Sequence, residues 1–136
     1  MLSFSKRNTQ YAVIAVFVIV NIFIWSATVR ADRHGELTVA FLDVGQGDAI
    51  YIEAPNGNQV LIDGGPSSGA VLRALGRVMP FYDRSIDLVL VTHPDQDHVG
   101  GLPAVIDRMN VATVVTTENT SDTGAYGALE KAILEK

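Results

Sequence analysis

Two histidines and two aspartates lie within six positions of this chain, in the segment Thr-His-Pro-Asp-Gln-Asp-His-Val-Gly-Gly of residues 92–101. His93, Asp95, Asp97 and His98 carry the nitrogen and oxygen ligands that zinc, manganese and iron accept. Without a cation, these groups would crowd like charge and desolvated polar atoms into one loop. The pattern therefore predicts a metal site, and a polar loop with capping aspartates is the alternative.

The spacing also predicts how the four side chains divide. His93 and Asp95 lie two positions apart just beyond an apolar strand, and in extended chain such side chains point to the same side. Pro94 disfavours helix at the residue before it, so the loop starts extended. Asp97 and His98 then turn towards the next helix. We expect two pairs of ligands, suited to two metals about 3.5–4 Å apart that activate water.

Two further segments could contribute to such a site. Asp63 ends an apolar strand in Leu-Ile-Asp-Gly-Gly and could support the metal loop from behind as a hydrogen-bond acceptor. The alternative is an ordinary aspartate in a turn. Gln46 and Asp48, in the glycine-rich loop of residues 43–48, are candidates for the lip of the active site, although a turn needs glycines whatever the function.

The elements that position these residues follow from hydrophobic periodicity and turn signals. We expect a β-meander followed by alternating helices and strands, which gives a mixed α/β sheet with helices packed on it. The predicted strands are Leu37–Leu42, Ala49–Glu53, Gln59–Asp63, Asp87–Thr92 and Val111–Thr116. The predicted helices run from Ser67 or Ser68 to about Met79, over Gly101–Met109 and over Ala125–Lys136.

Composition limits the function classes. The chain has 136 residues, no cysteine and a net charge of −5, so thiolate metal sites and disulfides are excluded. From Leu37 onward there are six Lys/Arg against thirteen Asp/Glu, a net charge of −7. A sequence-independent grip on nucleic acid needs a basic surface. Any phosphate substrate would therefore have to meet bound cations or the few arginines.

The positive mean hydropathy comes largely from one segment. Tyr11–Val29 is 19 residues without a charge, and as a helix it would span roughly 28 Å, close to a bilayer core. Lys6 and Arg7 precede it, which favours a cytoplasmic N-terminus and an extracytoplasmic domain at the inner membrane. The alternative is a cleaved signal peptide and a secreted domain. We expect an anchor over residues 1–30, a linker over 31–36 and a domain over 37–136.

Three motifs in order carry a family resemblance: Phe41-Leu-Asp-Val-Gly-Gln-Gly-Asp-Ala, Leu61-Ile-Asp-Gly-Gly and the segment of residues 92–101. Together they resemble the metallo-β-lactamase fold, and more narrowly the C-terminal metallo-hydrolase domain of ComEC-type competence proteins. The superfamily loop has histidine where Asp95 stands. Aspartate at this place is similar to the competence branch and shifts the expected metal preference towards harder ions such as manganese.

The resemblance implies an αββα sandwich with two divalent metals, zinc or manganese, at one sheet edge. His93 and Asp95 would bind the first metal, and Asp97 and His98 would bind the second, with Asp97 also a catalytic residue. The implied activity is hydrolysis of a phosphodiester, with nucleic acid as the substrate. No protein partner is implied, and the only other partner is the membrane that the single span would cross.

The family completes its site with ligands from the second half of the sandwich, and residues 37–136 match only the first half. We therefore expect an incomplete ligand set, an uncovered sheet face and no appreciable turnover by this chain alone. Two other functions stay open. One is a generic hydrolase of small esters or thioesters, and the other is a non-catalytic membrane-tethered module.

Overall fold

The computed structural model describes residues 6–31 and 35–136, which belong to two compact units, residues 1–33 and 34–136. Parts of the predicted anchor (1–5) and of the predicted linker (32–34) lie outside the described residues. The second unit begins close to the predicted boundary at residue 37.

The first unit is one helix, α1 (Lys6–Ala31). Its stretch Asn8–Ser26 has a mean hydropathy of 1.8, so the helix is long and apolar enough to cross a membrane by length and composition. Its polar side chains bond back to the helix backbone: Asn21 Nδ2 donates to the Phe17 carbonyl at 2.8 Å, and Ser26 Oγ donates to the Phe23 carbonyl at 2.8 Å. Such bonds satisfy the hydroxyl donor of Ser26 and one of the two amide N–H donors of Asn21.

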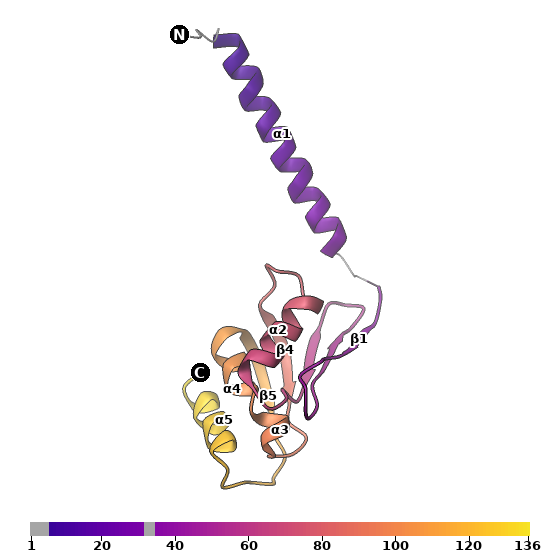
Figure 1. Ribbon diagram of the computed structural model, residues 1–136. Helices are drawn as coiled ribbons and strands as arrows, with labels where there is room; N and C mark the ends of the chain where they lie inside the picture. Colours follow the sequence, from indigo (N-terminus) through magenta and orange to yellow (C-terminus); the bar gives the residue numbers. More distant parts are fainter. Residues whose placement is uncertain (1–5, 32–34) are drawn as a thin grey trace. The chain divides into compact units, whose positions relative to one another are not determined.

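The second unit is built on a five-stranded sheet with the spatial order β1-β2-β3-β4-β5 (Figure 1). The first three strands form an antiparallel meander, and β3, β4 and β5 are parallel to one another. This mixed sheet confirms the predicted class. The strands are β1 (Thr38–Phe41), β2 (Ile50–Glu53), β3 (Gln59–Ile62), β4 (Ser85–Leu90) and β5 (Asn110–Val115).

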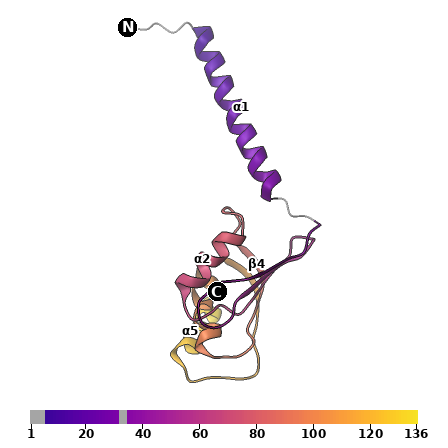
Figure 2. The same cartoon turned by 45° about the vertical axis from the view of Figure 1, so that its right-hand side comes forward.

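Four helices lie in the crossover connections and in the C-terminal segment: α2 (Ser68–Val78), α3 (Gln96–Val99), α4 (Leu102–Arg108) and α5 (Gly124–Leu134). In α2 the residues Val71, Ala74 and Leu75 are buried at helical spacing, so an apolar stripe faces the sheet. Figure 2 shows α2 and α5 beside the twisted sheet. The sequence did not predict α3, which starts directly inside the metal loop.

The two faces of the sheet differ in burial. On the helix-covered face the register aligns Tyr51, Leu61 and Val89, and each of these side chains has no exposed surface. On the other face Phe41 remains 81% exposed and Val115 43% exposed. The core therefore lies between one sheet face and the helices, and the second face presents an apolar surface, as the sequence predicted for half a sandwich.

The start of α2 lacks the side-chain capping bond that its serine predicts. Ser67 occupies the N-cap of α2, but its side chain makes no capping hydrogen bond. Its carbonyl instead accepts the N–H groups of Ala70 and Val71 at 3.2 and 3.3 Å. The start of α5 follows the ordinary pattern, since Thr123 Oγ1 accepts the Tyr126 N–H at 3.3 Å.

Candidate metal centre

The predicted site residues gather at one edge of the sheet. Because β3, β4 and β5 are parallel, their carboxyl ends meet there, together with the turn between β1 and β2. We call this the site edge and define it by the loops 42–49, 63–67, 91–101 and 116–123. These loops contain no Lys or Arg. They carry the carboxylates of Asp43, Asp48, Asp63, Asp95, Asp97, Glu118 and Asp122.

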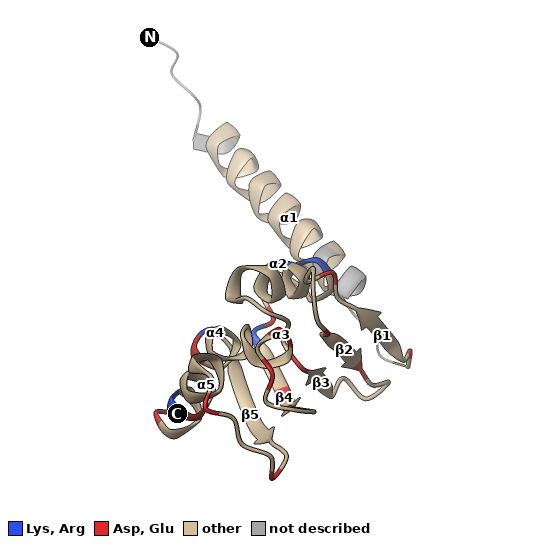
Figure 3. Ribbon diagram, turned by 60° about the horizontal axis from the view of Figure 1, so that its bottom comes forward, with Lys and Arg blue, Asp and Glu red and all other residues tan. Residues whose placement is uncertain are grey.

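This distribution accounts for all of the domain's net charge. Seven of the thirteen acidic residues from Leu37 onward lie at the site edge, and the remaining six are balanced by six Lys/Arg elsewhere. Figure 3 shows acidic positions along these loops. A net charge of −7 concentrated at one edge attracts cations and repels anions. The electrostatics of the edge therefore fit a site for divalent cations.

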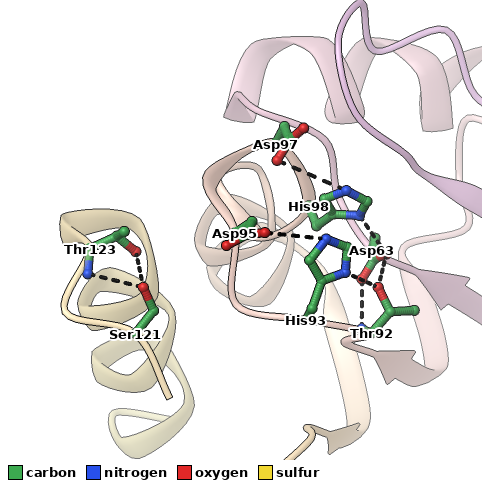
Figure 4. Close-up of polar contacts among 8 residues, drawn as sticks. All are labelled: Asp63, Thr92, His93, Asp95, Asp97, His98, Ser121 and Thr123. Atoms are coloured by element: carbon green, nitrogen blue, oxygen red, sulfur yellow. Dashed lines mark hydrogen bonds and ion pairs between the residues drawn. The ribbon is translucent and has the colours of Figure 1, made fainter. Parts of the chain in front are cut away.

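Asp63 is the buried centre of this edge. It follows β3 with φ of +58°, a left-handed conformation that is uncommon outside glycine, and its exposed fraction is 2%. Its N–H donates to the Leu90 carbonyl at 2.9 Å, which ties it to the end of β4. Its Oδ1 accepts the backbone N–H of Thr92 at 2.8 Å. Its Oδ2 accepts from Thr92 Oγ1 at 2.5 Å and lies 2.9 Å from His98 Nδ1 (Figure 4).

These contacts fix which ring nitrogens carry protons. A carboxylate only accepts, so His98 Nδ1 donates to Asp63. The Thr92 hydroxyl donates its single proton to Asp63 and therefore accepts a hydrogen bond from His93 Nδ1, 2.8 Å away. Each neutral imidazole therefore has its proton on Nδ1 and its lone pair on Nε2. This tautomer follows from the hydrogen-bond network, and it leaves both Nε2 atoms available as ligands.

Each of these Nε2 atoms faces a carboxylate of the same loop. His93 Nε2 lies 3.6 Å from Asp95 Oδ2, and His98 Nε2 lies 3.9 Å from Asp97 Oδ1 (Figure 4). Both distances are too long for hydrogen bonds. Two ligand atoms that each lie about 2.1 Å from a tetrahedral ion are about 3.4 Å apart. The two nitrogen–oxygen pairs therefore have nearly the separation that a cation needs, and the donor set fits divalent metal.

The two pairs also lie side by side. The ring centroids of His93 and His98 are 3.7 Å apart with an interplanar angle of 48°. Ligand atoms of Asp63, His93 and His98 all lie within 4.8 Å of one another, so this trio could itself hold an ion. We prefer Asp63 as a supporting residue, because both of its oxygens already accept hydrogen bonds that orient Thr92 and His98. The structure thus brings together all four predicted ligands and the predicted acceptor behind them.

Close backbone packing fixes the loop that carries the ligands. Gly47 has φ of +82°, and a Cβ atom there would lie 1.8 Å from the carbonyl oxygen of Asp97. On the other side, the Gly64 N–H donates to the His98 carbonyl at 2.7 Å. The loop 43–48 therefore lies directly against the metal loop. Gln46 and Asp48, the predicted lip residues, have exposed side chains on it.

Two contributors were missed from the sequence. Thr92 links Asp63 to His93, and the available signal was a hydroxyl residue directly before the first histidine. Gly47 makes the close approach to Asp97, but no separate signal in the sequence marks it, because Gly45 and Gly47 both have the positive φ that a glycine-rich turn explains. In both cases the partner is remote in sequence, so neither role follows from local pattern.

Comparison with known proteins gives one family match that covers more than half of the chain. Residues 42–128 match the family model Lactamase_B, described as the metallo-beta-lactamase superfamily. A lactamase-like protein, aptB, of Emericella nidulans is 28% identical over 85 residues, which are 62% of this chain and 28% of that protein. The chain thus spans under a third of the length of this curated relative.

Two solved structures are also similar. A metallo-beta-lactamase from Cronobacter sakazakii, an HARLDQ motif mutant, has 18% identity and a TM-score of 0.49 over 59% of this chain and 31% of that one. The metallo-beta-lactamase SMB-1, bound to 2-mercaptoethanesulfonate, has 30% identity and a TM-score of 0.44 over 60% and 30% of the two chains.

Proposed function

Because the chain belongs to the metallo-beta-lactamase superfamily, we propose that it is the metal-binding half of a hydrolase that uses two divalent ions. The observation that carries the proposal is the pairing of each histidine Nε2 with a carboxylate oxygen, at 3.6 Å for His93 with Asp95 and 3.9 Å for His98 with Asp97. One pair would hold the first ion, and the other pair would hold the second. Zinc and manganese both suit these ligands.

The chain's own residues have distinct tasks in such a reaction. Bound divalent ions supply Lewis acidity and lower the pKa of water so that it attacks at neutral pH. Asp63 holds the His98 ring by its Nδ1 and, through Thr92, the His93 ring, so the ligand nitrogens are oriented in advance. Asp97 is part-exposed at the mouth of the site, and we propose that it also accepts the proton of the attacking water.

Four ligands are too few for two catalytic ions, which hold about three protein ligands each. We propose that the remaining ligands come from the part of a longer protein that the curated relative possesses and this chain does not span. The apolar sheet face with Phe41 and Val115 supports this proposal, because a second sheet packed there would complete an αββα sandwich. By itself the chain would bind metal weakly and would not turn over substrate.

For the substrate we propose a phosphodiester, as the resemblance to the ComEC-type competence domain implies. In that case the bound cations must offset the −7 charge of the site edge before a polyanion can approach. A second candidate is a small uncharged ester, and the absence of any Lys or Arg from the site-edge loops favours it. The third candidate is a non-catalytic, membrane-tethered module. It would be supported if the longer protein bound metal but hydrolysed no substrate.

We also propose that α1 anchors the domain in the inner membrane with the domain outside the cytoplasm. The apolar stretch Asn8–Ser26 and the charges of Lys6 and Arg7 before it support this topology. A cleaved N-terminal segment and a secreted domain is the alternative. N-terminal sequencing of the protein recovered from the membrane fraction and from the secreted fraction distinguishes the two, since cleavage near residue 31 removes the anchor.

Metal binding by the full chain in detergent micelles tests the central proposal. Calorimetric titration with Mn²⁺ or Zn²⁺ is expected to show binding that His93→Ala and His98→Ala each weaken by about 10-fold or more. His34→Ala is the matched control, because it removes the remaining histidine of the chain, whose position in the sequence is outside the loops that define the site edge. Equal affinity in all four proteins would refute the proposed ligands.

The substrate class needs its own measurement. Where the reading frame continues beyond codon 136, the longer protein is assayed with manganese on bis(p-nitrophenyl) phosphate, on single-stranded DNA and on p-nitrophenyl acetate. Hydrolysis of the phosphodiesters supports the first candidate, and hydrolysis of the acetate alone supports the second. Bound metal without hydrolysis of any of them would contradict both.

A further inference from the structure

An aromatic pair projects from the edge of the sheet opposite the metal centre. Phe81 and Tyr82 lie in the loop between α2 and β4, with 84% and 55% of their surfaces exposed. Their rings contact each other edge to face, with centroids 5.3 Å apart and an interplanar angle of 81°. Contiguous exposed apolar side chains, unlike single ones, mark surfaces that meet an apolar partner.

The loop that carries this pair is firmly held. The Asp83 carboxylate accepts the Ser85 N–H at 2.9 Å, the Ser85 hydroxyl at 2.6 Å and the Gln59 amide at 2.5 Å. Gln59 is itself buried, with an exposed fraction of 4%. The backbone is thus anchored to β3 and β4 directly beside the aromatic residues. Their exposure therefore reflects a fixed outward position of the loop.

Two arginines line a hollow together with Phe81. This hollow has a volume of 230 Å³, and its lining also includes the apolar residues Leu72 and Met79 beside Arg84 and Arg108. Neither guanidinium forms an ion pair with another residue in the part of the chain that the structure describes. Aromatic tips flanked by unpaired arginines are complementary to a bilayer surface, where rings enter the headgroup region and guanidinium groups meet phosphate.

The net charge of the domain is concentrated at one edge. The whole net charge of −7 lies at the site edge, and the remainder of residues 37–136 is neutral, with six Lys/Arg and six Asp/Glu. An anionic surface is repelled most strongly by the site edge, whereas the edge with Phe81 and Tyr82 (the aromatic edge) carries Arg84 and Arg108 beside Asp83 and Asp107. Approach by the aromatic edge therefore leaves the metal centre open to solvent.

The segment between α1 and β1 is short. Six residues, 32–37, connect the last residue of α1 to the first residue of β1, and such a segment reaches about 20 Å at full extension. If α1 spans a bilayer, the domain is held within reach of the lipid headgroups, and a weak docking surface suffices at the resulting high effective concentration.

We infer that Phe81, Tyr82, Arg84 and Arg108 form a docking surface for an anionic phospholipid bilayer, which orients the domain with its metal centre away from the membrane. This rests on the proposed membrane anchor and is independent of the proposed hydrolase chemistry. Phosphate groups of the lipid would meet the two arginines, and the aromatic rings would enter the interface between headgroups and acyl chains.

The chain has a single tryptophan, Trp25, near the end of the candidate span, which makes the inference measurable by fluorescence. The full chain is reconstituted in nanodiscs of phosphatidylglycerol and phosphatidylcholine whose acyl chains are brominated near the headgroup. Three proteins are compared: the natural chain, Trp25→Phe with Phe81→Trp, and Trp25→Phe with Glu118→Trp. The last places an indole in an exposed site-edge loop as the matched control.

We expect quenching by brominated lipid of about two-fold or more for Trp25 and for the indole introduced by Phe81→Trp, and none for the control. Adding Arg84→Glu and Arg108→Glu to the Phe81→Trp protein is expected to reduce quenching to the control level, as is pure phosphatidylcholine. Tyr82→Trp provides a second probe should the Phe81 variant not fold.

The outcomes separate the proposals. Quenching of Trp25 without quenching at position 81 or 82 overturns the docking surface and leaves the anchor intact. An unquenched Trp25 overturns the anchor and the docking surface together, while the metal titration of the histidine variants is unaffected. Equal quenching at position 81 after both charge reversals overturns the role assigned to the arginines.

Discussion

Oδ2 of Asp63 lies 2.9 Å from Nδ1 of His98, although 35 positions separate the two residues in the chain. The same oxygen accepts the Thr92 hydroxyl, which in turn accepts from the His93 ring. One buried carboxylate therefore sets the tautomer of both histidines and turns both Nε2 atoms towards the acidic side chains of the metal loop. This relationship makes the supporting residues as testable as the ligands.

Replacement of Asp63 by Asn tests the supporting carboxylate. Asparagine tolerates the left-handed backbone at this position, so the change removes charge with little added backbone strain. We expect Mn²⁺ or Zn²⁺ affinity to fall by about 10- to 100-fold in calorimetric titration. Asp43→Asn, an exposed carboxylate of the same edge, is the control and should retain its affinity. Equal losses in both would indicate a general effect of edge charge.

Thr92 predicts a spectroscopic result that does not require metal. In the natural chain, two-bond ¹H–¹⁵N correlation spectra at neutral pH should show His93 and His98 as the Nδ1–H tautomer. Thr92→Val keeps the side-chain shape but removes the hydroxyl, so His93 should lose its fixed tautomer while His98 keeps its bond to Asp63. Thr92→Ser should restore the natural spectrum. An unchanged His93 tautomer in Thr92→Val would contradict the network.

Substitutions at two glycines distinguish the cost of backbone strain from the cost of a steric clash. Gly45 and Gly47 have φ of +86° and +82°, but a Cβ at Gly45 meets nothing within 4 Å, whereas one at Gly47 lies 1.8 Å from the Asp97 carbonyl oxygen. We expect Gly45→Ala to lower the free energy of unfolding by about 1 kcal/mol from strain alone. Gly47→Ala should lower the free energy of unfolding by more than this, as measured by thermal denaturation. It should also weaken metal binding, because the metal loop must shift. Equal effects of the two substitutions would argue against close packing of the loops.

Asp83 predicts a pH dependence of stability. Burial by itself would raise the pKa of this carboxyl group, but hydrogen bonds from the Ser85 hydroxyl and N–H and from the Gln59 amide outweigh it and hold the pKa below the usual 3.8. A lowered folded-state pKa stabilises the fold above the unfolded-state pKa and ceases to do so as pH falls through the folded value.

Asp83→Asn should therefore lower the melting temperature at neutral pH, and the difference from the natural chain should shrink below about pH 4. Asp107→Asn, at an exposed carboxylate, serves as the control in the same thermal melts. A melting difference that grows towards acid pH would show that the sign of the shift is wrong.

Local patterns were sufficient for much of this architecture. The five strands and the helices α2, α4 and α5 start and end within a few residues of the predicted bounds, since each has a clear hydrophobic period between strong turn signals. The metal loop could be proposed from the sequence because its four candidate ligands lie within six residues. The short helix α3 could not, because four residues carry no periodicity of their own.

By itself, the sequence determined which groups can bind a cation and in what order the elements follow, because both depend on neighbours along the chain. The tertiary structure decided what lies at each edge of the sheet. Parallel pairing of β3 and β4 carries Asp63 to the metal loop across 29 to 35 positions. The same pairing separates the acidic site edge from the edge with Phe81 and the arginines, because the ends of strands and helices are sorted only when the sheet forms.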